Sequence, residues 1–312
     1  MKAGEKMTYF LGVDLGGTNI KYVVIEIDDD KTTEVLKNQI STDATQGPEK
    51  VTANISRLIS EMDAKFNLAN VCVAVPGIFD HENGNILLFP NLPGAWSHFP
   101  FKQKISELSG KTISLINDAR AFCLAEATLG AGKGFRYVAC IVMGTGVGGG
   151  IVIDGKIHEG ASRGAGEIAH QVVSAEGSVC GCGTRGCAET FASSQAISRM
   201  ANTSSPEEAF EKAKAGDEKA ISAFQAAGKW LGIALANVNA VFSPEIFIIG
   251  GGVAQAGELV IDSIKKELHE RNHLWPNSVF EVVPAQLSYF AGATGAALRA
   301  AADYGFSLKA LK

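Results

Sequence analysis

The chain has 312 residues, of which 46% are hydrophobic and 20% are charged. This length is enough for one large or two medium globular domains with a substantial core. The net charge of −5, with lysines and arginines scattered along the chain, argues against a nucleic-acid partner. No apolar run approaches the length of about 20 residues that spans a bilayer, so we expect a cytoplasmic protein without a signal peptide or membrane partner.

The first predicted feature in chain order is a β-hairpin. The β-rich runs TYFLGVD and IKYVVIEI are separated by a glycine turn within the segment Asp14-Leu15-Gly16-Gly17-Thr18-Asn19. No helix follows, so neither a P-loop nor a Rossmann turn fits. Backbone N–H groups in such a turn suit phosphate oxygens, with the Thr18 hydroxyl beside them and Lys21 as a countercharge. Asp14 can hold a hydrated magnesium ion. A plain tight turn explains a single Gly-Gly pair equally well.

The next segments read as helices over 48–68 and 100–109, with a buried strand at 71–77 between them. The loop from Phe79 to Trp96 is too long for a simple connector, and either covers a ligand or is a mobile surface loop. The run TISLIND then ends at Asn117-Asp118, just before the helical run ARAFCLAEATLG. Asp118 is therefore a candidate site residue, although an aspartate at this point can equally cap the helix.

A second glycine turn repeats the first. Residues 137–153, YVACIVMGTGVGGGIVI, read as strand, Gly144-Thr145-Gly146, then strand, and Asp154-Gly155 forms the next hairpin turn. The repeat predicts two related α/β domains facing one another. Two opposed phosphate-binding hairpins can clamp a nucleotide across the cleft between them.

Residues 167–189 predict a metal site. One histidine and three cysteines are separated by glycines, a set that suits a tetrahedral zinc ion without an open position and hence a structural role. The less favoured alternative is a set of unrelated buried thiols. Carboxylates lie at both ends of the motif, so the metal is expected to stiffen a loop that holds acidic groups. The candidate ligands are His170, Cys180, Cys182 and Cys187; the glycines are Gly181, Gly183 and Gly186; the carboxylates are Glu167 and Glu189.

The rest of the chain is mainly helical. Helices with short breaks at TSSP and AGD are predicted from Ser193 to Val241, followed by the buried strand Glu245–Ile249 and a third glycine cluster, Gly250-Gly251-Gly252. Those glycines allow backbone to lie flat against an adenine or a ribose. A closing helix is predicted over 290–305. The remaining cysteines read as core thiols in a reducing compartment: Cys72, Cys123 and Cys140.

These motifs together resemble the ROK family (repressors, open reading frames and sugar kinases) of the actin-like ATPase superfold. DLGGTNIK resembles the first phosphate motif of the family, GTGVGGG the second, and GEIAH with CGCGTRGCAE the sugar and zinc signature. The resemblance extends from about Thr8 to the last helix. It implies an α/β fold with two actin-like (ribonuclease H-like) domains around a central cleft. The expected boundaries are 8–118 with the C-terminal helix at about 296–312 for one domain, and 119–295 for the other.

The resemblance also implies an activity and its residues. The activity is Mg²⁺- and ATP-dependent phosphorylation of a hexose or hexosamine, usually at the 6-hydroxyl, with Asp118 as the catalytic base. His170 would contact zinc through one ring nitrogen and the sugar through the other. The implied sugar-binding residues are Asn91, Asn117, Asp118, Glu167, His170 and Glu189. The predicted nucleotide-binding residues are Asp14, Gly16, Gly17, Thr18, Asn19, Lys21, Gly144, Thr145, Gly146, Gly250, Gly251 and Gly252.

Two residues depart from the family pattern. Ala169 replaces a glycine between Glu167 and His170, and Ala188 replaces a leucine. A methyl group at 169, near the anomeric end of the sugar, is expected to crowd an N-acetyl group. The resemblance to glucokinase-like members of the family, together with this methyl group, makes glucose the first expected substrate and mannose the second. The alternatives are an N-acetylmannosamine or N-acetylglucosamine kinase and a fructokinase. ATP versus polyphosphate as donor stays open, as does a homodimer versus a homotetramer.

Two other functional classes fit less well. A sugar-sensing regulator of this family needs a DNA-binding module, and neither the short segment before the first strand nor any basic helix provides one. A zinc-ribbon interaction module would place its cysteines in two Cys-x2-Cys knuckles and would leave the three glycine clusters unexplained. A sugar kinase accounts for all of these motifs.

Overall fold

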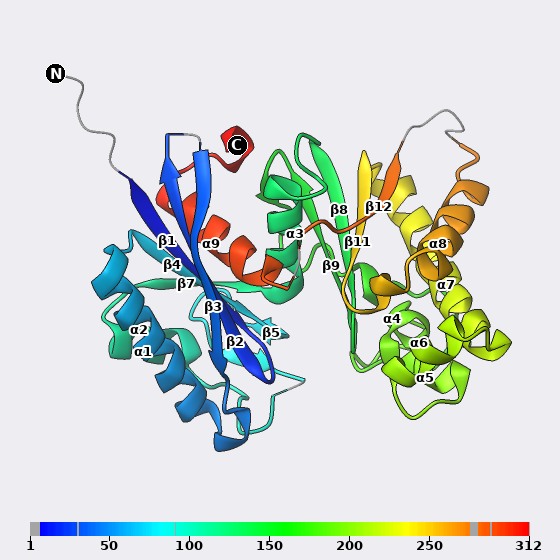
Figure 1. The fold of residues 1–312 in the computed structure, drawn as a ribbon, viewed down its shortest axis with the longest axis horizontal. Coiled ribbons are helices and arrows are strands. Elements are labelled where there is room, and N and C mark those ends of the chain that lie inside the picture. Colours follow the sequence, from blue (N-terminus) through cyan, green and yellow to red (C-terminus); the bar gives the residue numbers. More distant parts are fainter. Residues whose placement is uncertain (1–6, 30, 91, 275–279, 288, 312) are drawn as a thin grey trace. The chain divides into compact units, whose positions relative to one another are not determined.

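The computed structural model describes residues 7–29, 31–90, 92–274, 280–287 and 289–311 (Figure 1). The described chain divides into two compact units. Unit 1 comprises Met1–Lys133 with Leu287–Lys312, and unit 2 comprises Gly134–Gln286. The sequence-based prediction placed the first boundary earlier, after residue 118, and the second boundary later, before residue 296.

Close packing between two helices accounts for this difference. Helix α9 (Ala291–Tyr304) lies against α3 (Asp118–Leu129) so closely that a Cβ atom at Gly295 would collide with the backbone of Ala121. A Cβ at Gly12, in the first strand, would likewise collide with the carbonyl oxygen of Ala293. Only glycine permits such an approach of two backbones. Helices α3 and α9 therefore belong whole to unit 1, and α9 confirms the predicted closing helix.

Unit 1 is built on a mixed sheet. In the described residues this sheet has five strands, in the order β3-β2-β1-β4-β7. β1 pairs antiparallel with β2 and β2 with β3, whereas β4 lies parallel to β1 and β7 parallel to β4. The strands are β1 (Thr8–Leu15), β2 (Asn19–Asp28), β3 (Lys31–Ser41), β4 (Asn70–Val75) and β7 (Ile113–Asn117).

Unit 2 repeats this arrangement. Its sheet, over the part of the chain that the structure describes, has five strands in the order β10-β9-β8-β11-β12, with the same sequence of antiparallel and parallel pairs. The prediction of two related α/β sheets, each opening with a glycine hairpin, is confirmed. The strands are β8 (Tyr137–Met143), β9 (Val147–Ile153), β10 (Lys156–Ile157), β11 (Ile246–Gly250) and β12 (Glu281–Pro284).

Two of the helices have ordinary start and stop residues. Helix α1 has Pro48 in its first turn and ends at Asn67, which adopts a left-handed conformation. Helix α7 starts after Asp217, whose carboxylate accepts a hydrogen bond from the Ala220 amide. The remaining bounds are α1 (Pro48–Phe66), α2 (Phe101–Ser109), α4 (Glu189–Ala192), α5 (Ser194–Ala201), α6 (Pro206–Lys214), α7 (Glu218–Phe242), α8 (Glu258–Glu270), and the short 3₁₀ turns η1 (Ala44–Gln46), η2 (Ile168–His170), η3 (Val253–Ala256) and η4 (Leu308–Ala310).

The segment predicted as a long loop over 79–96 is packed, not loosely attached. It contains a small antiparallel pair, β5 (Ile78–Phe79) with β6 (Ile86–Leu88). Its aromatic side chains Phe89 and Trp96 are buried in the core of unit 1, with ring centroids 4.9 Å apart. The alternative of a mobile surface loop is therefore wrong for the described part of this segment.

Helices α7 and α8 pack closely together in the core of unit 2. In unit 2, Gly228 and Gly232 of α7 bring this helix close to α8, since a Cβ at Gly232 would lie 3.0 Å from the carbonyl oxygen of Ile264. The thiols predicted to lie in the core are buried and form no disulfide among the described residues: Cys72, Cys123 and Cys140. Burial raises the pKa of Cys72 to about 12. None of the described helices combines the length and apolar character needed to cross a membrane.

Candidate functional site

The first glycine turn joins β1 to β2 and is held from the end of β3. The Gly16 amide donates to the Asn19 carbonyl at 3.1 Å, and the buried Thr42 donates its hydroxyl to the Gly16 carbonyl at 2.7 Å. The Thr42 amide also donates to the Thr18 carbonyl at 2.9 Å. Gly17 and Thr18 are exposed at the tip. The predicted hairpin is confirmed, and its tip offers exposed backbone to a ligand.

Asp14, at the end of β1, is a buried carboxylate. Burial raises its pKa, and the ammonium group of Lys21, 3.3 Å away, partly opposes that rise. Gly292, in the first turn of α9, lies so close that a Cβ there would be 2.8 Å from Asp14 Oδ2.

Tyr289 is a neighbour of this turn that the sequence analysis did not predict. Its ring lies 4.2 Å below Lys21 Nζ, and its hydroxyl accepts a hydrogen bond from Asn19 at 3.5 Å.

Asn117 and Asp118 lie at the junction of β7 and α3, where only Asn117 caps the helix. Asn117 caps the helix: its Oδ1 accepts from the Arg120 amide at 3.2 Å, while its Nδ2 donates to the Gly77 carbonyl at 3.3 Å. Asp118 is the first residue of α3 and accepts a hydrogen bond from the Ala119 amide at 2.8 Å. The alternative of Asp118 as the helix cap is wrong, because its neighbour fills that position.

The second glycine turn joins β8 to β9 in unit 2, as predicted. The Gly144 amide donates to the Gly146 carbonyl at 2.8 Å, and the Ser194 amide of α5 donates to the Gly144 carbonyl at 2.9 Å. The Val147 amide donates to Glu189 Oε2 at 3.0 Å. A Cβ at Gly146 would lie 2.7 Å from that same oxygen, which explains the glycine. The carboxylate of Glu189 therefore fixes one side of the turn.

The glycines of β9 bring the segment before His170 onto the sheet. A Cβ at Gly149 would lie 3.1 Å from the carbonyl oxygen of Gly166, and Gly166 has a φ of 91°. This contact places Glu167 and η2 against β9, with the Glu167 side chain exposed and His170 half-buried. The glycines of GTGVGGG thus also allow the segment that carries Glu167 and His170 to pack closely on β9.

The four predicted metal ligands gather at one point. The candidate ligand atoms of His170, Cys180, Cys182 and Cys187 all lie within 4.8 Å of one another. His170 Nδ1 is 3.6 Å from Cys180 Sγ, and Cys182 Sγ is 3.6 Å from Cys187 Sγ. The latter separation is far beyond the ~2.05 Å of a disulfide. Ligand atoms around tetrahedral zinc, at about 2.3 Å from the ion, stand about 3.8 Å apart. The donor set and its spacing fit zinc.

Two of the glycines in this loop are required by its shape. Gly183 and Gly186 have φ angles of 89° and 80°, and a Cβ at Gly186 would collide with the Ser174 carbonyl oxygen. Gly181 differs, since a Cβ there would meet open space. Of the three glycines named from the sequence, the backbone therefore requires two.

The pKa values of two thiols in this cluster are shifted in opposite directions. Burial raises the pKa of Cys180 to about 12, and the Glu189 carboxylate adds to the rise. A hydrogen bond from the Thr184 amide lowers the pKa of Cys182 to about 7. Cys180 Sγ donates to Glu189 Oε1 at 3.2 Å. Glu189 therefore links the cysteine loop to the second glycine turn, a connection that the sequence motif does not reveal.

Ala169 does not occupy the position expected from sequence. Its side chain is 2% exposed and belongs to the hydrophobic core of unit 2. Ala188 is completely buried. The expectation that the Ala169 methyl group crowds an N-acetyl group of a sugar is therefore wrong, because this methyl group faces the core.

The third glycine cluster follows β11. Gly250 is buried in the strand, Gly252 is exposed, and Gly251 has a φ of 88° with its Cα against the end of β8. A Cβ at Gly251 would collide with the carbonyl oxygen of Met143. The predicted strand and glycine cluster are confirmed, and the short turn η3 and helix α8 follow them.

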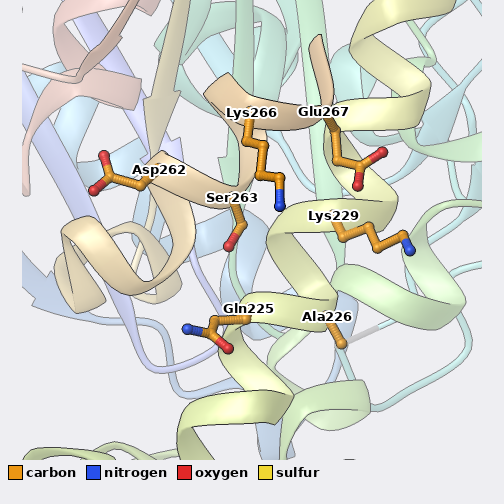
Figure 2. Close-up of a pocket in the computed structure, with 7 residues that line it drawn as sticks. All are labelled: Gln225, Ala226, Lys229, Asp262, Ser263, Lys266 and Glu267. Atoms are coloured by element: carbon orange, nitrogen blue, oxygen red, sulfur yellow. The ribbon is translucent and has the colours of Figure 1, made fainter. Parts of the chain in front are cut away.

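The predicted site residues fall into groups by unit. Asp14, the first turn, Asn117 and Asp118 belong to unit 1. The second and third turns, Glu167, Glu189 and the metal ligands belong to unit 2. Asn91, predicted to bind sugar, lies outside the described residues. A separate hollow of about 420 Å³ lies between α7 and α8 and is lined by polar side chains including Lys229, Lys266 and Glu267 (Figure 2). No predicted site residue lines this hollow.

Comparison with known proteins identifies related chains. Residues 10–302 match the ROK family profile. A glucokinase from Thermotoga maritima is 33% identical, with 92% of this chain and 95% of that protein covered. A ROK hexokinase from Thermus thermophilus superposes with a TM-score of 0.84 at 31% identity, covering 95% and 99%. A glucokinase from Streptomyces griseus, solved with glucose and AMPPNP, gives a TM-score of 0.76 at 31% identity, covering 95% and 100%.

The similarity extends to other activities. An N-acetylmannosamine kinase from Vibrio cholerae is 32% identical, with 93% of this chain and 98% of that protein covered. A ROK-family transcriptional regulator gives a TM-score of 0.81 at 26% identity, covering 99% of this chain and 82% of the regulator. The fold alone therefore does not decide between these activities.

Proposed function

The chain belongs to the ROK family, and we propose that it is an ATP-dependent kinase that phosphorylates the 6-hydroxyl of glucose or a closely related hexose. The observation that carries the proposal is the repeated glycine hairpin at the start of each sheet, between β1 and β2 and between β8 and β9. The similarity to glucokinases over more than nine-tenths of the chain supports the same activity. Asp118 gives the proposal its chemistry, since it stands at a strand end where its carboxylate is not used as the helix cap.

The glycine turns are proposed to bind the nucleotide. In unit 1, the exposed tip at Gly17 and Thr18 offers backbone N–H groups to phosphate oxygens, and Lys21 supplies positive charge nearby. In unit 2, the corresponding turn is Gly144-Thr145-Gly146, and the exposed Gly252 allows a nucleoside to approach backbone closely. Positioning and charge stabilisation of this kind are the main contributions of a protein to phosphoryl transfer.

Asp14 is proposed to hold Mg²⁺ through water. A buried carboxylate whose pKa is raised by burial gains most from a nearby cation, and its contact with Lys21 is long for an ion pair, at 3.3 Å. The first turn of α9 adds a positive dipole end near the carboxylate, since Gly292 lies against Asp14. When bound, the ion would neutralise charge on the phosphates.

The sugar-binding residues are proposed from the family resemblance and supported by local geometry. Asp118 would accept the proton of the 6-hydroxyl as the phosphoryl group transfers. Asn117 has both amide atoms engaged, with Arg120 and with Gly77, and is therefore held rigidly beside it. Hydrogen bonds to the ring hydroxyls are proposed for Asn91, Asn117, Glu167, His170 and Glu189. A fixed set of such partners discriminates strongly against sugars that lack one of the hydroxyls.

Zinc is proposed to occupy the cluster of one histidine and three cysteines. The Nδ1 atom of His170 faces Cys180, which leaves Nε2 for a sugar hydroxyl. With four protein ligands the ion has no open position, so it would stiffen the loop and take no part in the chemistry. The contacts from Glu189 to Cys180 and to Val147 would pass this rigidity to the second glycine turn.

An N-acetylhexosamine kinase is the second candidate. The burial of Ala169 removes the steric argument against an N-acetyl group, and an N-acetylmannosamine kinase is among the relatives. Glucose stays the first candidate because a glucokinase resembles the chain at 33% identity over 92% of its length. The net charge of −5 and the scattered basic residues support a protein without a nucleic-acid partner, and the core thiols, which form no disulfide among the described residues, support a reducing cytoplasmic environment.

Substrate choice is tested by one kinetic comparison. The purified protein is assayed for ADP release with Mg²⁺-ATP and equal concentrations of glucose, mannose, fructose, N-acetylglucosamine and N-acetylmannosamine. We expect the highest kcat/KM with glucose and the next highest with mannose. A tenfold or greater lead by either acetylated sugar would contradict the aldohexose assignment and favour the second candidate.

A further inference from the structure

Both chain connections between the units start beside one side chain. The chain leaves unit 1 after Lys133 and returns to it at Leu287. Glu126, in the last turn of α3, accepts hydrogen bonds from both of these connections. Its Oε2 accepts from the Ala131 amide at 3.0 Å, and its Oε1 accepts from the Leu287 amide at 2.7 Å. One carboxylate therefore bonds to both the segment that leaves unit 1 and the segment that returns to it.

The surroundings of Glu126 are built for this arrangement. The residue is completely buried. Its backbone carbonyl accepts from the amides of Gly130 and Gly132, at 3.1 and 2.9 Å. A Cβ at Gly130 would collide with Glu126 Oε2, so glycine at this position lets the carboxylate stay where it is. A carboxylate without solvent is stable only with such partners, which the two connections supply.

Helix capping alone does not explain these contacts. The hydrogen bond from the Ala131 amide resembles an ordinary contact at a helix C-terminus, because Ala131 follows Glu126 by only five residues. Leu287 is 161 residues away in sequence and contributes nothing to ending α3. A side chain needed only to close the helix would have no reason to reach the returning connection.

We propose that Glu126 anchors both chain connections of unit 1 to the end of α3 and is a positioning residue for catalysis. It fixes both connections to the end of α3, and the same helix begins with Asp118. Loss of this anchor would therefore loosen the helix that carries the proposed base. The anchor follows from the contacts alone, whereas its effect on catalysis rests on the proposed function.

The test uses Glu126→Gln with a matched control. The amide of glutamine keeps one acceptor oxygen, so at most one of the two backbone amides retains its bond. The control is Asp63→Asn in α1, because Asp63 accepts from the Leu68 amide at 2.9 Å, also five residues along and also in unit 1. That position lies away from both connections. Glu126→Asp is the second variant, since it keeps the charge but is too short to reach both amides.

The first measurement is backbone hydrogen–deuterium exchange of the full-length protein without sugar or ATP. Loss of a buried acceptor should accelerate exchange at the Ala131 or Leu287 amides about tenfold or more in both Glu126 variants, with no change there in Asp63→Asn. Unchanged exchange at both amides would overturn the anchor. This result is independent of the proposed kinase activity, so failure of one idea is distinguishable from failure of the other.

The second measurement separates positioning from stability. In the sugar-dependent assay, the Glu126 variants should lower kcat and raise the sugar KM together, reducing kcat/KM about tenfold, because a displaced α3 carries Asp118 with it. Asp63→Asn should stay within about twofold of the wild type. Equal kinetic losses in the Glu126 and Asp63 variants would contradict the positioning role and show that Glu126 only ends the helix.

Discussion

Replacement of Asp118 by asparagine should separate catalysis from folding at the start of α3. The helix cap is Asn117, whose bond to the Arg120 amide is untouched by the change. Asparagine also keeps an oxygen for the Ala119 amide, which now donates to Asp118 at 2.8 Å. What is lost is one negative charge in the first helical turn, worth about 0.3–1 kcal/mol. For units of this size that corresponds to a fall in Tm of at most about 4 °C.

The effect on turnover should be far larger. An amide cannot accept the proton of a sugar hydroxyl, and loss of a general base lowers rates by about 10²–10⁴-fold. That range corresponds to about 2.7–5.5 kcal/mol in the activation barrier. Sugar affinity should change little, because the amide oxygen can still accept a hydrogen bond from the hydroxyl.

The assay is sugar-dependent ADP release at saturating Mg²⁺-ATP, with sugar affinity measured separately by calorimetry and Tm by thermal unfolding. Asp217→Asn is the matched control, because Asp217 also stands at a helix start and accepts from the Ala220 amide at 2.9 Å. We expect this control within about twofold of wild-type turnover. Turnover of Asp118→Asn within threefold of the wild type would refute its role as the base.

Three further predictions concern the metals and the cysteine loop. Metal analysis should find about one zinc per chain, and its removal by a chelator should abolish sugar binding; full activity without zinc would contradict this. Asp14→Ala should weaken the use of Mg²⁺ more than sugar affinity, so a parallel loss of both would count against the proposed role. Gly186→Ala should destabilise the loop by about 1–3 kcal/mol or more and lower its zinc content, because its φ is 80° and its Cβ would collide with Ser174. Gly181→Ala is the control, with open space for its Cβ, and equal zinc content in the two variants would contradict the strain argument.

The features that the sequence predicts well are local ones. Both glycine hairpins, the Asp154-Gly155 turn and the strand before Gly250 follow from short runs in which strand and turn residues alternate. The metal ligands are also predictable, because cysteine and histidine at this spacing have few other uses. The repeated sheet could be inferred because the same hairpin occurs twice in one chain.

The features that the sequence does not predict depend on contacts between distant residues. The burial of Ala169 depends on how η2 packs on the core of unit 2, which no local pattern specifies. Glu189 reads as a site carboxylate, yet its bond to Val147 spans 42 residues. The bond between Glu126 and Leu287 spans 161 residues. The extent of unit 1 likewise depends on a distant contact, the packing of Gly295 against Ala121.

The most direct test of hexose kinase activity is identification of the product by ³¹P NMR. The purified wild-type protein is incubated with Mg²⁺-ATP and glucose, and a parallel sample omits the sugar. We predict stoichiometric conversion of ATP to ADP and a single phosphate monoester at the 6-position of glucose, with ATP stable in the sample without sugar. No sugar phosphate from glucose or any other hexose in the panel, or a phosphate at another hydroxyl, would contradict the proposed function.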